Sequence, residues 1–309
     1  MAKDHAADEE EEEEGVQVVN REGFPLSSHL WNGMWKRAEH AHPDKKKITK
    51  IRNSEIVQNL PVAVPPTLKT SHSVTDKLCL IQKYISELQY DYTGLQFFEI
   101  KKGRPLVRLM DVAKSIIRES LPIKCLEAVI LALYLTSDMS AIQRFPLSFK
   151  TCFEGNSYKH IVLGIYCNGK FGALGLSRRD TLMYKELKYE SLYELLREFI
   201  NCYHSCYHTV DRIKLGLPVN HDNQSMEVIM WKYMYMRPGK LSEKEFRQQC
   251  DTYSRQLRGS NAHHLKYAAL RAKETIKDNN AGSRVAITDM SDSDANSVKY
   301  QKVTKRGSR

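Results

Sequence analysis

Residues 121–135 read LPIKCLEAVILALYL, and residues 160–177 read HIVLGIYCNGKFGALGLS. The apolar run in the first stretch predicts a buried helix over 123–134, because a helix that is apolar on every side avoids water only inside a core. The second stretch predicts two strands joined at Asn168-Gly169, a dipeptide that suits a two-residue hairpin turn. A buried helix beside an antiparallel hairpin indicates the α+β class.

Apolar spacing predicts further elements on both sides of this centre. Helices are expected over 30–40, 74–88, 106–120 and 243–257, and a strand over 145–153. Ser191 and Glu194 have the spacing of a capping box, which predicts a helix that begins at Leu192. Apolar residues continue at helical spacing through Ile213, so this helix is expected to run to Gly216.

The two ends of the chain differ in composition from its middle. Residues 1–25 contain the acidic run DEEEEEE at 8–14, which cannot bury apolar surface, so a disordered tail is expected there. Residues 259–309 are polar and basic and are expected to form a second disordered tail. Between the tails we expect an N-terminal helical region over 26–110 and a core region over 111–258.

Length and charge exclude several classes of protein. The longest apolar run has eight residues, whereas a transmembrane helix needs about 20, and the N-terminus lacks the apolar segment of a secretory signal. A cytoplasmic location and seven free thiols are therefore expected. Residues 1–15 carry a net charge of −7, so the rest of this +10 chain carries +17 and favours an anionic partner. No RRM, KH or zinc-finger motif accompanies the basic residues, so nucleic acid is not expected as that partner.

Cys125 heads the predicted buried helix, one residue after Lys124. The partial positive charge of a helix N-terminus and an adjacent ammonium both favour the thiolate, which is the reactive form of a catalytic cysteine. The alternative is a small core residue, since cysteine often serves only for packing. Cys125 is therefore a candidate nucleophile.

The hairpin provides candidate partners for this cysteine. If Asn168-Gly169 forms the turn, an unbroken register places His160 directly opposite Ser177. A hydroxyl beside an imidazole can orient the ring, as the third member of a Cys-His-X triad does. The alternatives are a surface pair without function, or a bulge at one of the hairpin glycines that shifts the register.

The cluster Cys202-x-His204-x-Cys206-x-His208 has the residue types of a metal site. Two residues advance about 200° around a helix, so on the expected helix the cysteines and the histidines lie on opposite sides. Four ligands cannot converge there, and we expect no metal and no cofactor. A pair of ligands completed by residues from elsewhere is the remaining alternative.

Longer segments of the chain closely resemble the vasohibin family. They are LQYDYTGLQFFEIKKGRPL (88–106), LPIKCLEAVILALYL (121–135), FPLSFKTCFEGNSYKHIVLG (145–164) and GALGLSRRDTLMYK (172–185). The resemblance implies a papain/transglutaminase-like cysteine protease core, over 111–258, with an N-terminal helical subdomain. It also implies a tubulin carboxypeptidase that removes the C-terminal tyrosine of α-tubulin.

The resemblance implies a role for each member of the triad. The family's catalytic cysteine, histidine and serine match Cys125, His160 and Ser177, which the helix and hairpin patterns had also indicated. His160 would take the thiol proton, and the thiolate would attack the carbonyl of the penultimate residue to form a thioacyl-enzyme.

The family's substrate-binding residues match Tyr90, Lys124 and Arg178. A carboxypeptidase needs a cation for the terminal carboxylate, and an arginine can bind it through two hydrogen bonds. Lys102 is a further expected contact with the acidic tubulin tail, toward which the +17 charge would steer the enzyme.

The resemblance also implies a partner, the small helical vasohibin-binding protein. It would dock on the N-terminal helical region, with Leu30, Trp31, Met34 and Trp35 as part of the surface. Association with the cytoskeleton is expected, and family members imply that secretion can occur. The alternative functions are a non-catalytic binder of microtubules or another polyanion, and acyl transfer to an amine as in transglutaminases.

Overall fold

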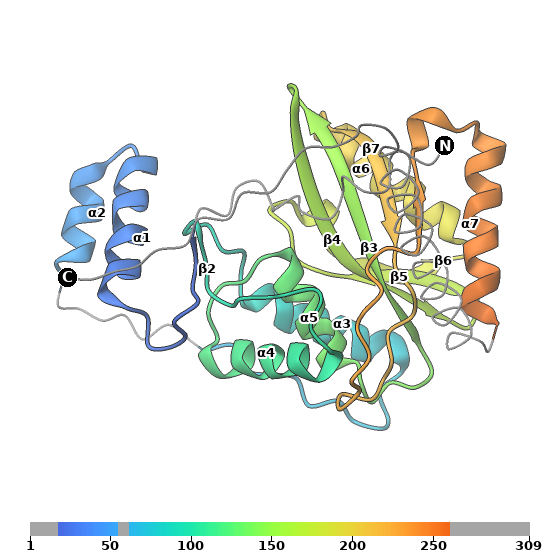
Figure 1. The fold of residues 1–309 in the computed structure, drawn as a ribbon, viewed down its shortest axis with the longest axis horizontal. Helices are drawn as coiled ribbons and strands as arrows, with labels where there is room; N and C mark the ends of the chain where they lie inside the picture. The colour runs from blue at the N-terminus through green and yellow to red at the C-terminus, as the bar shows by residue number, and fades with distance from the viewer. Residues whose placement is uncertain (1–17, 55–61, 260–309) are drawn as a thin grey trace, which may run out of the picture. The chain divides into compact units, whose positions relative to one another are not determined.

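The structure is a computed structural model that describes residues 18–54 and 62–259. At its centre is a six-stranded antiparallel sheet in the order β6-β5-β4-β3-β7-β8 (Figure 1). The strands are β3 (Gln143–Phe153), β4 (Asn156–Cys167), β5 (Lys170–Leu174), β6 (Lys185–Tyr189), β7 (Thr209–Leu215) and β8 (Met234–Met236). Helices cover the sheet, so the expected α+β class is confirmed.

The hairpin β4–β5 has the register that the Asn168-Gly169 turn predicts. Both turn residues have positive φ, and the pairs run from Cys167 opposite Lys170 to Leu163 opposite Leu174. The paired register ends there, because the side chain of Gln82 takes both backbone groups of Gly175, at 2.9 and 3.0 Å.

The expected cross-strand pair between His160 and Ser177 is therefore wrong. Ser177 lies beyond the end of β5, and the cross-strand neighbour of His160 is Phe149 on β3. An outgoing strand whose hydrogen bonds are supplied by a side chain no longer follows its partner strand.

Three helices and residues of one face of the sheet belong to one continuous hydrophobic cluster. The helices are α3 (Val74–Glu87), α4 (Leu106–Glu119) and α5 (Cys125–Leu135), close to the bounds that the apolar spacing predicts. The residues of α5 from Ala128 to Leu133 are at most 1% exposed, so the helix is surrounded by protein. The expected division at residue 110 falls inside α4, and α4 packs on α5, so the helical region and the core share one interior.

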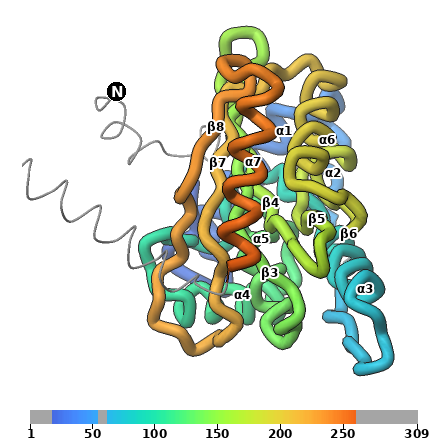
Figure 2. The backbone as a smooth tube through the Cα atoms, turned by 90° about the vertical axis from the view of Figure 1, so that its right-hand side faces the viewer, coloured from blue at the N-terminus to red at the C-terminus, as the bar shows by residue number. Residues whose placement is uncertain are grey.

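The helices α6 (Leu192–Ser205) and α7 (Glu243–Arg258) belong to a second hydrophobic cluster on the other face. Figure 2 shows α7 alongside β8, with α6 beyond it. Phe149 of β3 packs against Phe199 and Tyr203 of α6, at 4.9 and 5.3 Å between ring centroids. No helix of the described residues is long and apolar enough to cross a membrane.

The expected extension of α6 to Gly216 is wrong, because the helix ends at Ser205 and β7 follows. Val210 pairs with Thr151 and Arg212 pairs with Lys150, so Asp211 is an extra, bulged residue. The bulge lets Val210 and Ile213 both face the core although they are three residues apart. This spacing imitates the period of a helix.

The N-terminal residues begin with β1 (Val18–Val19), which pairs in parallel with β2 (Leu95–Gln96). Asn20 is buried and donates to the backbone carbonyl oxygens of Gly23 and Phe97. Residues 18–25 are therefore tied to the fold, contrary to the expected tail over 1–25, whose residues 1–17 lie outside the described ones. The expected C-terminal tail, 259–309, lies outside them apart from Gly259.

Two helices follow β1, α1 (Ser28–Ala41) and α2 (Lys45–Arg52). The first confirms the helix expected near the tryptophans, and Pro43 comes just after its end. The second begins at the cap residue Asp44, whose carboxylate accepts from the N–H of Lys47. Residues 55–61, which follow soon after α2, lie outside the described residues.

Candidate active site

Cys125 is the first residue of α5 and is 9% exposed. Lys124 precedes it in the cap position, where its carbonyl accepts from the N–H of Ala128. The N-terminus of a helix carries a partial positive charge, which favours a thiolate at the first residue of α5. The position therefore suits a nucleophile, as the sequence predicts.

The carboxylate of Glu127 holds this turn in place from inside the protein. It accepts from the N–H of Lys124 at 2.5 Å and from the N–H of Phe98 at 3.3 Å. Glu127 is 1% exposed, and its burial raises the pKa of the carboxyl to about 7. The sequence analysis missed this role, because a capping box is recognised by a serine or threonine at the cap position and residue 124 is a lysine.

The ammonium of Lys124 is already engaged. Its Nζ lies 3.0 Å from Oδ2 of Asp91 and donates to the carbonyl of Leu95 at 2.9 Å. Asp91 is 2% exposed, and its other oxygen accepts from both the N–H and the hydroxyl of Thr93. The pair is therefore a buried ion pair that fixes the direction of the lysine.

Tyr90 and Arg178 lie together beside this turn. Tyr90 forms a parallel bridge with Ile123, and the N–H of Asp91 donates to the carbonyl of Ile123. The guanidinium carbon of Arg178 lies 5.4 Å from the centroid of the Tyr90 ring, which is a cation–π contact. Three expected substrate residues, Tyr90, Lys124 and Arg178, thus lie around the start of α5.

His160 lies on β4, with its ring nitrogen Nε2 2.8 Å from the backbone carbonyl oxygen of Leu182. Burial lowers the pKa of the imidazole to about 4, so the ring is neutral at pH 7. A neutral ring that donates Nε2–H to Leu182 keeps Nδ1 as the acceptor nitrogen. Leu182 is a functional candidate that the sequence did not indicate, because every residue carries a backbone carbonyl.

Ser177 makes a different contact from the expected one. Its hydroxyl oxygen accepts from the N–H of Arg179 at 3.3 Å, so it supports the loop that carries Arg178. The ring-orienting contact of His160 comes from Leu182, within the 3-10 turn η1 (Asp180–Leu182). The same loop therefore supplies the cation over Tyr90 and the carbonyl that holds the imidazole.

Comparison with known proteins decides the family. The model of the vasohibin family matches residues 16–258, which is most of the chain. The chain belongs to the vasohibin family. It is also 44% identical over 261 residues to the mouse protein Tubulinyl-Tyr carboxypeptidase 1, covering 81% of this chain and 70% of that relative. The resemblance that the sequence segments indicate is confirmed.

Two further predictions concern Lys102 and a metal site. Lys102 contacts Trp231: the indole N–H of Trp231 donates to the backbone carbonyl of Lys102, and the Lys102 ammonium lies 5.7 Å from the centroid of the Trp231 ring. These contacts do not join Lys102 to Tyr90 or Arg178. Among the described residues, no group of three or more His, Cys, Asp or Glu side chains could hold a metal ion.

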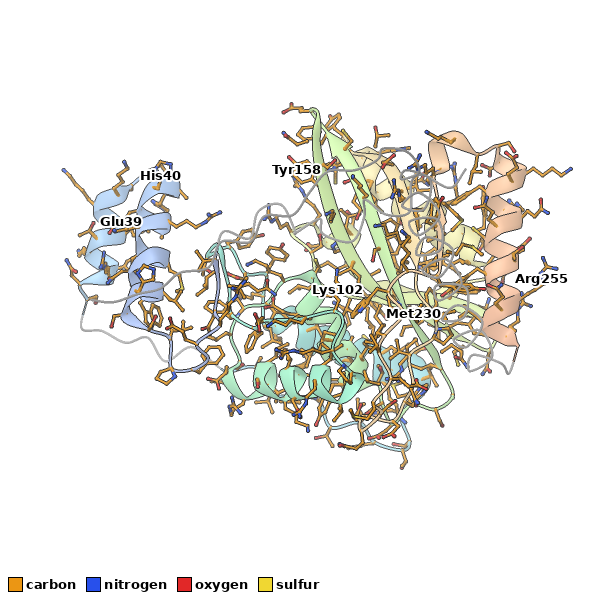
Figure 3. All side chains as sticks on the ribbon, viewed as in Figure 1. Glu39, His40, Lys102, Tyr158, Met230 and Arg255 are labelled. Carbon is orange, nitrogen blue, oxygen red and sulfur yellow. The ribbon has the colours of Figure 1, made fainter. Side chains whose placement is uncertain are left out.

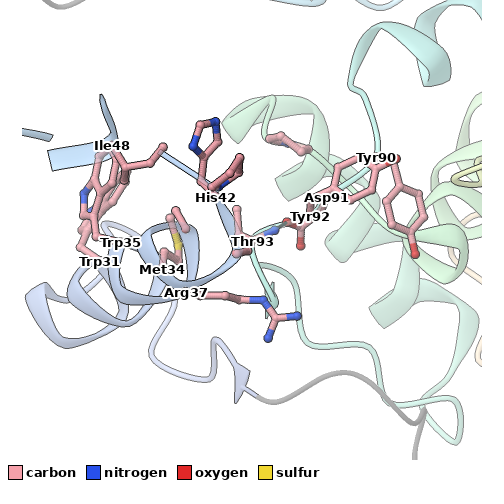
Figure 4. A pocket seen from close by; sticks show the side chains of 14 residues that line it. Trp31, Met34, Trp35, Arg37, His42, Ile48, Tyr90, Asp91, Tyr92 and Thr93 are labelled. Carbon is pink, nitrogen blue, oxygen red and sulfur yellow. Dashed lines mark hydrogen bonds between the residues drawn. The ribbon is translucent and has the colours of Figure 1, made fainter. Parts of the chain in front are cut away.

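A groove of about 510 Å³ lies next to the candidate site of this vasohibin. Figure 4 shows Trp31, Met34, Trp35 and Ile48 on one side of it and Tyr90 to Thr93 on the other. Trp31 is 47% exposed, whereas Leu30, its neighbour on α1, is buried in the hydrophobic core. Three of the four residues expected to bind a partner therefore line one apolar groove.

Proposed function

We propose that this chain is a cysteine-type carboxypeptidase that removes the C-terminal tyrosine of α-tubulin. The observation that carries the proposal is Cys125 at the start of the buried helix α5, beside the Tyr90–Arg178 pair. The 44% identity to a relative named Tubulinyl-Tyr carboxypeptidase 1 supports the same substrate. Membership of the vasohibin family supports a transglutaminase-like arrangement of the helix and the sheet.

The first chemical step is transfer of the thiol proton of Cys125 to His160. A neutral imidazole that donates Nε2–H to Leu182 offers Nδ1 as the base, which is the state that its low pKa favours. The thiolate attacks the carbonyl of the penultimate residue, and His160 returns the proton to the departing tyrosine amine. Water then hydrolyses the thioacyl-enzyme and releases the shortened chain.

Arg178 is the proposed cation for the terminal carboxylate, and Lys124 supports it. The Arg178 side chain is exposed and planar, so it can donate two parallel hydrogen bonds to the carboxylate. Lys124 contributes charge from its fixed position beside Asp91. We assign Ser177 the role of a positioning residue that acts on His160 through the loop, because its hydroxyl accepts from the N–H of Arg179 and the same loop carries the Leu182 carbonyl that contacts the imidazole. Lys102 is the proposed contact further along the tail.

The test is tyrosine release from microtubules, followed by mass spectrometry of the α-tubulin tail. Cys125→Ala should abolish release, while Cys152→Ala, at an exposed thiol, should leave it unchanged. Release by both variants alike would contradict the mechanism. Microtubule binding without release by the native chain would instead support the non-catalytic binder.

We infer that the small vasohibin-binding protein docks in the groove of Figure 4 and that the complex acts at the cytoskeleton. Trp31→Ala removes an exposed indole from the groove and should weaken binding of that partner at least about tenfold in calorimetry. Tyr207→Ala, at a tyrosine that is 84% exposed elsewhere, is the matched control. Equal affinity for both variants would place the partner on another surface.

A further inference from the structure

A second pocket, of about 410 Å³, lies between α4 and the turn that follows β1. Its lining includes four arginines, Arg21, Arg104, Arg108 and Arg118. The last three lie on one side of α4 or just before it, because residues 104, 108, 111, 115 and 118 recur every three or four positions. The opposite side of α4 is buried in the core.

The cations around this pocket outnumber the carboxylates that they contact. Glu99 lies within 3.3–3.8 Å of Arg21, Lys101 and Arg104 at once. Asp111 lies between Arg108, at 3.7 Å, and Lys114, at 3.2 Å, and Arg118 donates through Nε to Glu119 at 2.7 Å. A carboxylate offers about four lone pairs, so several guanidinium N–H groups remain available to another carboxylate.

The arginine side chains are open to solvent, and the floor beneath them is apolar. Arg21, Arg108 and Arg118 have side-chain exposures of 76%, 70% and 68%. Phe24 and Phe98 form the floor, with ring centroids 5.4 Å apart. Guanidinium groups above an apolar floor suit a peptide that combines carboxylates with methylene groups, which describes glutamate.

A glutamate-rich segment of this chain is tethered close to the pocket. Glu14 precedes Val18 by four residues, and Val18 is fixed by pairing with Leu95. At about 3.3–3.6 Å per residue of extended chain, Glu14 can lie up to about 13 Å from Val18, and Asp8 up to about 35 Å. Arg21, which lines the pocket, follows Val18 by only three residues. The distance from Val18 to the pocket is therefore well within the reach of residues 8–14.

We propose that the arginine pocket is a binding site for a glutamate-rich peptide and that its occupant in this chain is the run 8–14. A tether this short gives an effective concentration in the millimolar range, which compensates for the weak energy of each exposed ion pair. The run carries seven acidic residues, which complements the excess of cations around the pocket. The inference is independent of the proposed carboxypeptidase activity.

The test is binding of a fluorescent hexaglutamate peptide, measured by anisotropy. In the full-length chain, residues Glu9 to Glu14 are all changed to Gln, which should free the pocket and tighten peptide binding about tenfold relative to the native chain. Adding Arg108→Gln and Arg118→Gln should abolish this gain. The matched control adds Lys244→Gln and Arg255→Gln on α7, where Arg255 points into solvent (Figure 3), and should keep it.

Each contrary outcome overturns a defined part of the proposal. Equal peptide affinity in the native chain and the Gln variant would show that residues 8–14 do not occupy the pocket. Binding to the Gln variant that survives the two pocket substitutions would place the site elsewhere. An absence of binding to the Gln variant at low salt would remove the pocket as an acidic-peptide site.

Discussion

The guanidinium of Arg178 lies over the ring of Tyr90, with its central carbon 5.4 Å from the ring centroid. Tyr90 follows α3 and Arg178 follows β5, so the contact joins two segments that are far apart in the sequence. The aromatic face restricts the long arginine side chain before substrate arrives. A cation that is already positioned loses less entropy when it binds a carboxylate.

Arg178→Lys should raise KM for tyrosine release about tenfold, with a smaller change in kcat. Lysine keeps the charge but loses the planar fork that binds a carboxylate through two parallel hydrogen bonds. The melting temperature should stay unchanged because Arg178 is exposed. Steady-state kinetics checks this, and an unchanged KM would assign the carboxylate to another cation.

His160→Gln should alter the dependence of stability on pH. The folded pKa of His160, about 4, lies below its ordinary value of 6.5, so the unfolded chain binds more protons between these pH values. The contribution of His160 to stability is therefore complete above pH 6.5 and falls as pH drops toward 4. Between pH 7.5 and 5 the native chain should lose about 1–2 kcal/mol more than the variant.

Urea unfolding at both pH values measures this difference. Glu127 has the opposite effect, because burial raises its pKa to about 7 and favours the folded state at low pH. The comparison with the variant isolates His160, since Glu127 is present in both proteins. Identical pH dependence in both would mean that the imidazole is not desolvated in the fold.

Arg144→Met should destabilise the fold by about 3 kcal/mol. The Arg144 guanidinium is buried and donates at 2.7 Å to the carbonyls of Leu133, near the end of α5, and of Asn220. Methionine leaves these acceptors without a donor. Urea unfolding measures the loss, and Arg255→Met, at an exposed position on α7, should stay within about 0.5 kcal/mol of the native chain.

Gly164→Ala should cost about 1–3 kcal/mol through overpacking. Gly164 faces Phe145 across the β3–β4 pair, and a Cβ atom at Gly164 would collide with the Phe145 ring. Phe145→Leu alone should also destabilise, but in the double variant the costs should be less than additive because leucine leaves room for the methyl group. Strict additivity in thermal unfolding would show that the ring is not the obstacle.

The central elements were predictable because their signals are local. The apolar run of α5, the Asn168-Gly169 turn and the cap at Ser191 each depend on neighbours along the chain, and each lies where expected. The candidate nucleophile followed from the same signals, since the start of a buried helix can be read from its sequence. The end of α6 was not predictable in this way, because the bulge at Asp211 gives a strand the spacing of a helix.

The sequence by itself therefore determined the α+β class, the helix that presents Cys125, and the turn that joins β4 to β5. Only the tertiary structure decided that Gln82 ends the β5 pairing, that Asp91 holds Lys124, and that the Leu182 carbonyl meets His160. Periodicity and turn chemistry act between residues close in sequence, so they are visible in one chain. Contacts between distant segments, above all those made by backbone groups that every residue carries, have no local signal and appear only once the chain is folded.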